Sequence, residues 1–243
     1  MTPDIFSDKI NNGDNMNISG FQKLTLLDFP GHTACTLFTL GCNMRCPFCH
    51  NTPLVTGTAQ ESYSEEEIFS FLKKRQGLLD GVAITGGEPL LQKDIAQFLR
   101  KIKDLGYSVK LDTNGSFPDK LSLLLEEGLV DFVAMDIKNT KEKYSLTSGV
   151  EIDFSLIEKS VDIIKNSGID REFRTTVVKE YHTEEDIISI AKFLGKTEKY
   201  YLQCFKDSGD ILSEGCSAPD SEMLKSAAEK AKEYVLLCET RGI

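Results

Sequence analysis

The order of apolar and polar positions predicts short buried strands that alternate with amphipathic helices. Residues 33–39 form a β-branched and apolar run, which is typical of a strand buried on both faces. Ser64 and Glu67 form a capping-box sequence just before the apolar series that starts at Ile68, so a helix is predicted to begin there. The predicted strands are 33–39, 81–85, 107–112, 131–137, 172–178 and 199–205. The other predicted helices are 95–102, 121–127, 156–164, 183–194 and a long final one over 220–239.

Strands that alternate with helices of this length indicate β-α units and a parallel sheet. A closed eight-unit barrel typically needs about 250 residues, which is more than six units require. We therefore expect an α/β fold, an open and partial (β/α)6 TIM-like barrel of parallel strands. A flat doubly wound sheet is the alternative. Residues 1–17, rich in Asn and Asp, are expected to be a flexible lead-in, and residues 18–243 a single domain.

Composition narrows the class of protein. The 243 residues are 40% apolar and 27% charged, as in ordinary globular proteins, and no stretch has the apolar length of a membrane span. The net charge of −10 argues against broad nucleic-acid binding, which needs a basic surface. Seven cysteines, three of them clustered, do not suggest a secreted disulfide framework. We expect a cytoplasmic protein with no nucleic-acid or membrane partner.

The clustered cysteines, Cys42, Cys46 and Cys49, lie in one short loop directly after the first predicted strand. Three thiolates from one loop can hold an iron–sulfur cluster, and a cubane cluster normally takes four. The remaining iron would be open to a substrate or cofactor, as an open position is on a catalytic metal. The spacing, together with His50, also permits a Cys3His zinc site. An enzyme with a cluster and a zinc-bearing interaction module both remain possible at this point.

Polar residues follow the other predicted strands where each strand ends. In parallel β/α folds ligands bind at the carboxyl ends of the strands. The second strand ends in Gly86-Gly87-Glu88, where paired glycines permit close backbone approach and the carboxylate can accept hydrogen bonds from an ammonium group. Taken singly, such a group is more often a turn or a solvated charge. Polar groups at five successive strand ends predict a ligand site. The candidates on the later strands are Asp112, Asp136, Lys138 and Arg174.

These motifs together resemble a known superfamily. The Cys-x3-Cys-x-Phe-Cys loop resembles the signature of radical S-adenosylmethionine (SAM) enzymes, and Gly-Gly-Glu-Pro resembles their motif for the SAM amino group. Thr-Gly-Gly-Glu-Pro-Leu-Leu-Gln, Asp-Thr-Asn-Gly and Met-Asp-Ile-Lys resemble the activating enzymes of glycyl-radical enzymes. Residues 21–51 look most like the branch that activates anaerobic ribonucleoside-triphosphate reductase. The resemblance covers roughly residues 18–210.

The resemblance implies an anaerobic oxidoreductase with a [4Fe–4S] cluster on Cys42, Cys46 and Cys49, and with SAM chelating the fourth iron. A one-electron donor such as flavodoxin or ferredoxin would drive reductive cleavage of SAM. The resulting radical would abstract hydrogen from a glycine of the partner, here expected to be anaerobic ribonucleotide reductase. A radical SAM enzyme that acts on a small molecule or a peptide is the second hypothesis, and the zinc-bearing module is the third.

The resemblance also assigns residues to SAM. Phe48 would lie against the adenine, and Glu88 with Gly86 and Gly87 would hold the amino group. The strand-end residues would line the rest of the pocket, with Lys138 reaching the ribose or carboxylate. The residues expected there are Asp112, Asp136, Lys138 and, as a second carboxylate partner, Arg174.

Three features fit no motif. Gln203 or Lys206 occupies the position of a SAM-contacting histidine in pyruvate formate-lyase activases, so its role is open. Cys204, Cys216 and Cys238 are too widely spread for a loop motif and are interpreted as buried or surface thiols. His182, just before a predicted helix, is expected to be solvated.

Overall fold

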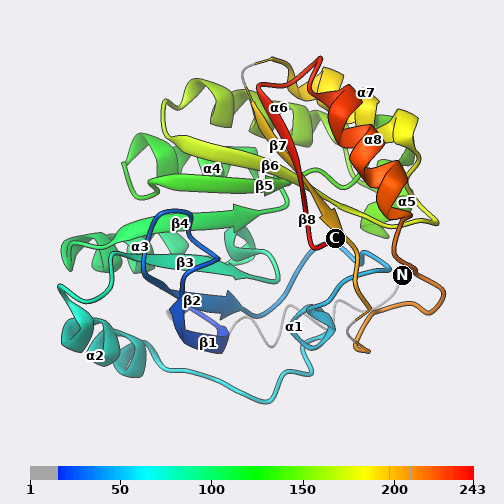
Figure 1. Cartoon of the computed structure of the whole chain (residues 1–243). Coiled ribbons are helices and arrows are strands. Elements are labelled where there is room, and N and C mark those ends of the chain that lie inside the picture. The colour runs from blue at the N-terminus through cyan, green and yellow to red at the C-terminus, as the bar shows by residue number, and fades with distance from the viewer. Residues whose placement is uncertain (1–15, 197, 208) are drawn as a thin grey trace. The chain divides into compact units, whose positions relative to one another are not determined.

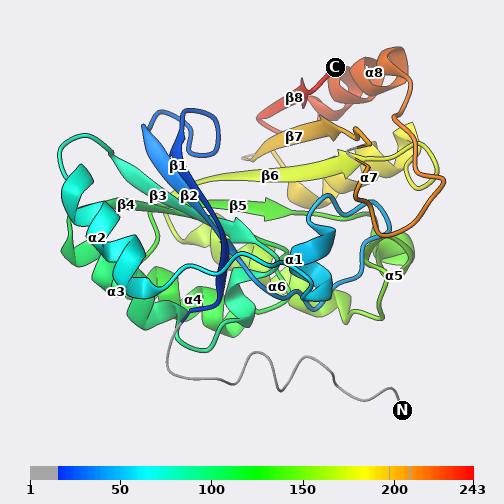
Figure 2. The same ribbon diagram turned by 90° about the horizontal axis from the view of Figure 1, so that it is seen from below.

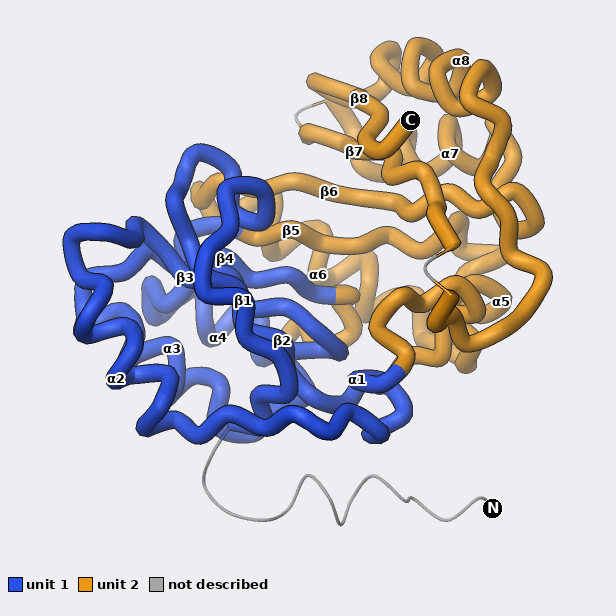
Figure 3. The backbone as a smooth tube through the Cα atoms, turned by 60° about the horizontal axis from the view of Figure 1, so that its bottom comes forward, with its two compact units in different colours: residues 1–43, 53–113, 119–132 blue, residues 44–52, 114–118, 133–243 orange. Residues whose placement is uncertain are grey.

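The computed structural model describes residues 16–196, 198–207 and 209–243, in which helices and strands alternate along the chain (Figures 1 and 2). The chain divides into two compact units (Figure 3). Unit 1 contains the described residues up to 43 together with 53–113 and 119–132, and unit 2 contains 44–52, 114–118 and 133–243. Cys42 therefore belongs to unit 1, and Cys46 and Cys49 belong to unit 2.

Unit 1 is built on four neighbouring strands in the order β1-β2-β3-β4. The strands are β1 Ile18–Thr25, β2 Ala34–Thr39, β3 Gly81–Gly86 and β4 Ser108–Thr113. The first pair is antiparallel, and β2, β3 and β4 are parallel. Because Thr39 pairs with Gly86, β2 and β3 end side by side. The helices are α1 Thr52–Thr56, α2 Glu65–Arg75, the 3-10 turn η1 Pro89–Leu91, α3 Ile95–Asp104 and α4 Pro118–Glu126.

Unit 2 has four strands in the order β5-β6-β7-β8, and β6, β7 and β8 pair in parallel. They are β5 Phe132–Asp136, β6 Asp170–Val177, β7 Lys199–Cys204 and β8 Leu237–Arg241. Gln203 of β7 pairs with Arg241 of β8, so Arg241 lies near the carboxyl end of β7. The helices are η2 Lys141–Lys143, α5 Tyr144–Ser148, α6 Phe154–Asn166, α7 Glu184–Leu194 and α8 Ser221–Ala231.

Local sequence explains where these helices begin and what they bury. Ser64 and Glu67 form the predicted capping box at the start of α2, and Thr183 with Asp186 forms a second one at α7. The helix α3 buries Ile95, Phe98, Leu99 and Ile102, which share one face at helical spacing. No helix in the described part of the chain is long and apolar enough to cross a lipid bilayer.

The six predicted strands are all present within two residues of their expected bounds, which confirms the α/β class with mostly parallel strands. The predicted final helix over 220–239 is wrong, because α8 ends at Ala231 and the following apolar segment pairs with β7 as β8. Residues 1–15 of the predicted flexible lead-in lie outside the described residues. Met16 is buried, and the backbone N–H of Asn17 donates to Gln92 Oε1 at 3.3 Å.

Candidate active site

In unit 1 the Gly-Gly-Glu turn is fixed to the start of the cysteine loop by backbone hydrogen bonds. The N–H of Gly87 donates to the Thr39 carbonyl at 2.9 Å. The N–H of Glu88 donates to the carbonyl of Gly41, the residue before Cys42, at 2.8 Å. The two segments are far apart in sequence, and the side-by-side ends of β2 and β3 bring them together.

Both glycines of the turn are required by geometry. Gly86 has a φ of 111°, a conformation that side chains with a Cβ rarely adopt. A Cβ on Gly87 would lie 1.9 Å from the Gly41 carbonyl oxygen, far inside van der Waals contact. The glycine pair therefore lets the turn pack directly on the backbone next to Cys42.

The Glu88 side chain is wholly buried, and its carboxylate is held in one orientation. Its Oε1 accepts hydrogen bonds from the Leu90 N–H and from the Thr113 hydroxyl, each at 2.9 Å. The first bond caps η1, so the carboxylate also stabilises the turn that carries it. Contact between Glu88 and a SAM ammonium group stays a prediction.

Asp112 lies on β4 in an ion pair with Lys110, two residues earlier on the same face of the strand. The Lys110 side chain is almost fully buried, and its ammonium lies 5.9 Å from the centre of the Phe132 ring. The sequence prediction for Asp112 did not include this partner. Any ligand that approaches Asp112 meets a paired carboxylate.

In unit 2 the rest of the cysteine loop is held by hydrogen bonds to its backbone. The N–H of Cys49 donates to the Cys46 carbonyl at 3.1 Å, and the Thr52 hydroxyl donates to the Cys49 carbonyl at 3.0 Å. The Pro47 carbonyl accepts from the N–H of Ser213 at 2.9 Å. These bonds fix the spacing of the two cysteines within the loop.

The same loop also packs closely against α5. The N–H of Arg45 donates to the Ser148 carbonyl at 2.7 Å. Gly149, with a φ of 71°, approaches so closely that a Cβ there would lie 2.0 Å from the Arg45 carbonyl oxygen. This close contact anchors the residue before Cys46.

Aromatic residues surround Phe48, which is itself buried. Its ring centre lies 5.9 Å from that of Tyr181 and 6.3 Å from that of His182. The expectation that His182 is solvated is wrong, because it is buried and its ring nitrogens contact the Val178 N–H at 3.1 Å and the Lys138 carbonyl at 2.8 Å. The orientation of Phe48 is therefore fixed by its neighbours.

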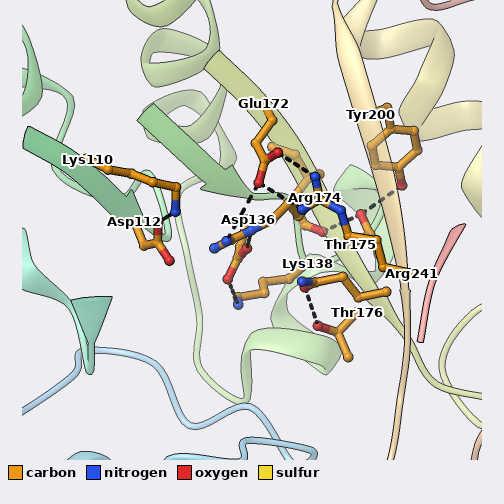
Figure 4. Close-up of polar contacts among 12 residues, drawn as sticks. Lys110, Asp112, Asp136, Lys138, Glu172, Arg174, Thr175, Thr176, Tyr200 and Arg241 are labelled. Atoms are coloured by element: carbon orange, nitrogen blue, oxygen red, sulfur yellow. Dashed lines mark hydrogen bonds and ion pairs between the residues drawn. The ribbon is translucent and has the colours of Figure 1, made fainter. Parts of the chain in front are cut away.

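Asp136, Lys138 and Arg174, three of the predicted site residues, meet in one cluster (Figure 4). Asp136 accepts from Lys138 Nζ at 3.0 Å and from Arg174 Nε at 2.9 Å. Burial alone would raise the pKa of Asp136, but the two cations hold it well below its usual range. Burial alone would lower the pKa of Lys138, but Asp136 raises it above its usual range. All three groups therefore stay charged at neutral pH.

The cluster also acts on the cysteine loop. Burial raises the pKa of the Cys46 thiol, and the positive charge of Lys138 is the largest opposing influence. A nearby cation favours the thiolate, which is the form that ligates metal. Within the residues that the structure describes, no three His, Cys, Asp or Glu side chains form a ready-made site for a single metal ion.

Sequence reasoning missed Glu172 and Arg241, which extend the charged cluster through two further ion pairs (Figure 4). The spacing Glu172-x-Arg174 places both side chains on one face of a strand, which is a signal that the sequence did contain. Arg241 gave no such signal, because it lies beyond the predicted final helix over 220–239 and no strand was predicted there.

Comparison with known proteins identifies the family. The model of the radical SAM superfamily matches residues 36–194, well over half of the chain. The chain belongs to the radical SAM superfamily. A protein of Methanocaldococcus jannaschii, provisionally named a glycyl-radical enzyme activating enzyme, is 34% identical over 226 residues, 90% of this chain and 92% of its own. The pyruvate formate-lyase-activating enzyme of Listeria monocytogenes is 31% identical over 148 residues, 54% of this chain and 57% of its own.

A solved structure also has a similar fold. The structure of Streptococcus suis SuiB bound to S-adenosylmethionine matches with a TM-score of 0.66 at 15% identity, over 84% of this chain and 48% of SuiB. At this identity the match concerns the fold alone, and it is consistent with the expected partial barrel.

The radical SAM family implies a [4Fe–4S] cluster and SAM as cofactors. The described residues fit both groups. Three thiols share one loop, a glycine turn packs on the backbone beside the first of them, and a cationic cluster influences the second.

Proposed function

We propose that this chain is an activating enzyme that generates a glycyl radical on a partner enzyme. The observation that carries this proposal is the similarity to the M. jannaschii protein over nearly the full length of both chains. A match confined to the cysteine loop would support only a radical SAM enzyme of unspecified substrate. Here the similarity also includes the residues on both sides of the cysteine loop.

In this proposal Cys42, Cys46 and Cys49 hold the cluster. When bound, the cluster and SAM supply the one-electron chemistry that removes a hydrogen atom from glycine. The loop's backbone hydrogen bonds keep the cysteines at fixed spacing, and Cys46 among them is buried.

The remaining predicted residues bind SAM. Phe48, held by its aromatic neighbours, provides a face for the adenine. Gly86, Gly87 and Glu88 hold the amino group beside Cys42.

The charged cluster of unit 2 binds the carboxylate of SAM, the negatively charged group of the ligand. Lys138 and Arg174 attract the carboxylate, and Asp136 keeps both cations in place. Asp112, fixed by Lys110, lines the pocket.

Anaerobic ribonucleoside-triphosphate reductase is the proposed partner, supported by the resemblance of residues 21–51 to its activating proteins. Flavodoxin or ferredoxin is the proposed electron donor. The test is anaerobic reconstitution with iron, sulfide, SAM and a reductant, followed by assay for 5′-deoxyadenosine and by electron paramagnetic resonance. We expect a glycyl-radical doublet on the reductase.

Pyruvate formate-lyase is the matched control partner. A doublet on it alone would retain the activating function but change the partner. Cleavage of SAM with no radical on any glycyl-radical enzyme, together with consumption of a small molecule or peptide, would replace the activating function. Zinc in the purified protein before reconstitution, and no uptake of iron and sulfide on reconstitution, would favour the zinc-bearing module.

Glu88→Gln is expected to weaken SAM binding by roughly ten- to a hundredfold while the cluster stays bound, because charge-assisted hydrogen bonds contribute about 1.5–3 kcal/mol. The amide oxygen can still accept from Leu90 and Thr113, so the turn is retained. Equilibrium dialysis with SAM and iron analysis measure the two effects. Thr113→Val removes one donor but keeps the charge, so its effect on SAM affinity is expected to be smaller. Equal SAM affinity in Glu88→Gln and the unmodified protein would assign Glu88 to the turn alone.

A further inference from the structure

The final strand brings Arg241 to the charged cluster of unit 2. Its Nη1 and Nη2 donate to the two oxygens of Glu172 at 3.0 and 2.7 Å (Figure 4). Its guanidinium carbon lies 3.5 Å from the centre of the Tyr201 ring. A two-point ion pair combined with ring stacking fixes the guanidinium in one orientation.

Glu172 connects Arg241 to Arg174. The Glu172 side chain is only 4% exposed, and its Oε1 lies 3.9 Å from Arg174 Nη1. Arg174 uses Nε for Asp136, which also binds Lys138. Five charges thus alternate in one row: Lys138, Asp136, Arg174, Glu172 and Arg241. Three cations and two carboxylates leave the row with one net positive charge.

Removal of Arg241 would change both the charge and the geometry of this row. The buried Glu172 carboxylate would lose its two-point partner, and Arg174 is the nearest remaining cation in the row. A buried carboxylate must be paired, so it would draw Arg174 away from Asp136. The row would then be neutral and would no longer attract an anion.

We infer that Arg241 is a positioning residue for the carboxylate of SAM, acting through Glu172 to keep Arg174 in its contact with Asp136. This inference rests on the proposed function, in which Arg174 and Lys138 face that carboxylate. Arg241 itself is not required to touch the ligand. Its role is to satisfy Glu172, and a lysine would do so poorly because it lacks the planar fork.

The experiment compares the affinities of anaerobically reconstituted protein for SAM and for decarboxylated SAM, measured by equilibrium dialysis. The unmodified protein should prefer SAM. Arg241→Gln should bind SAM at least about tenfold more weakly, a typical effect of one charged hydrogen bond. Its affinity for decarboxylated SAM should change little, so the preference between the ligands should shrink.

A second substitution provides a rescue. In the double variant Glu172→Gln/Arg241→Gln the carboxylate that competes for Arg174 is gone, and the row of Lys138, Asp136 and Arg174 again carries one net positive charge. We expect its SAM affinity to return toward that of the unmodified protein. A purely structural role of the ion pair predicts that the double variant recovers thermal stability while the preference for SAM over decarboxylated SAM is the same in all the variants.

Arg171→Gln is the matched control. Arg171 directly precedes Glu172 on β6, so its side chain points to the other face of the strand, and it forms a two-point pair with Glu198 through Nε and Nη2, at 2.6 and 3.0 Å. Glu198 is as buried as Glu172, so this variant should lose comparable thermal stability. Its preference for SAM over decarboxylated SAM should be unchanged.

The outcomes separate the two proposals. If the unmodified protein fails to bind SAM, the proposed function is wrong. If it binds SAM and Arg241→Gln keeps the full preference for SAM, the positioning role is wrong. An equal loss of preference in Arg171→Gln, or no recovery in the double variant, would also overturn the positioning role.

Discussion

Replacing Cys42, Cys46 or Cys49 singly with alanine is expected to abolish both the bound cluster and SAM cleavage. The loop supplies three thiolates, so each variant leaves two, which hold a cubane cluster poorly. Iron and acid-labile sulfide analysis after anaerobic reconstitution measures the first loss, and 5′-deoxyadenosine formation measures the second.

Cys204→Ala and Cys216→Ala are the matched controls, because both thiols are partly exposed and lie outside the loop. Each should keep the full iron content. A triple alanine variant of the loop that still bound about four irons would contradict the prediction. The cluster would then have to be assigned to Cys204, Cys216 and Cys238.

The strands were predictable because their sequences contain buried, β-branched runs between turn residues. The run 33–39 coincides with β2 except for its first residue, and Val82, Ala83 and Ile84 of β3 are almost completely buried. Short β-branched runs of this kind are typical of a central strand, so local sequence and tertiary packing agree here.

The last strand was not predictable in the same way. The residues from Val235 to Cys238 are apolar and follow α8 with no glycine or proline between them. They fit the continuation of a helix as well as a strand. This segment becomes the strand β8 because it pairs with residues Lys199 to Gln203 of β7. Local sequence does not show that β7 has an unpaired edge for it to join.

The candidate site was predictable as a set of strand ends but not as a set of partners. Asp136, Lys138 and Arg174 were expected near one ligand, and their direct contacts with each other are what the structure adds. The ion pair between Lys110 and Asp112 could have been predicted, because residues two apart on a strand lie on the same face. The contact of Arg241 with Glu172 joins β8 to β6 across β7, so it depends on the order of the strands.

Gly87→Ala is expected to reduce SAM cleavage by on the order of a hundredfold, with a matching loss of SAM affinity. The added Cβ would lie 1.9 Å from the Gly41 carbonyl oxygen, and backbone atoms cannot give way as a flexible side chain would. The turn must therefore move away from the residue before Cys42. A shift of about 1 Å at a catalytic group is enough for a loss of this size.

The control for this variant is Gly106→Ala. Gly106 has a φ of 86° and would meet no atom within 4 Å if it carried a Cβ, so its substitution strains the backbone without displacing a neighbour. It should lower the free energy of unfolding by about 1–2 kcal/mol and leave SAM affinity unchanged. Thermal unfolding and equilibrium dialysis with SAM distinguish the two variants. Normal SAM affinity in Gly87→Ala would show that the turn does not position SAM, since the clash with Gly41 would then have been relieved without consequence for binding.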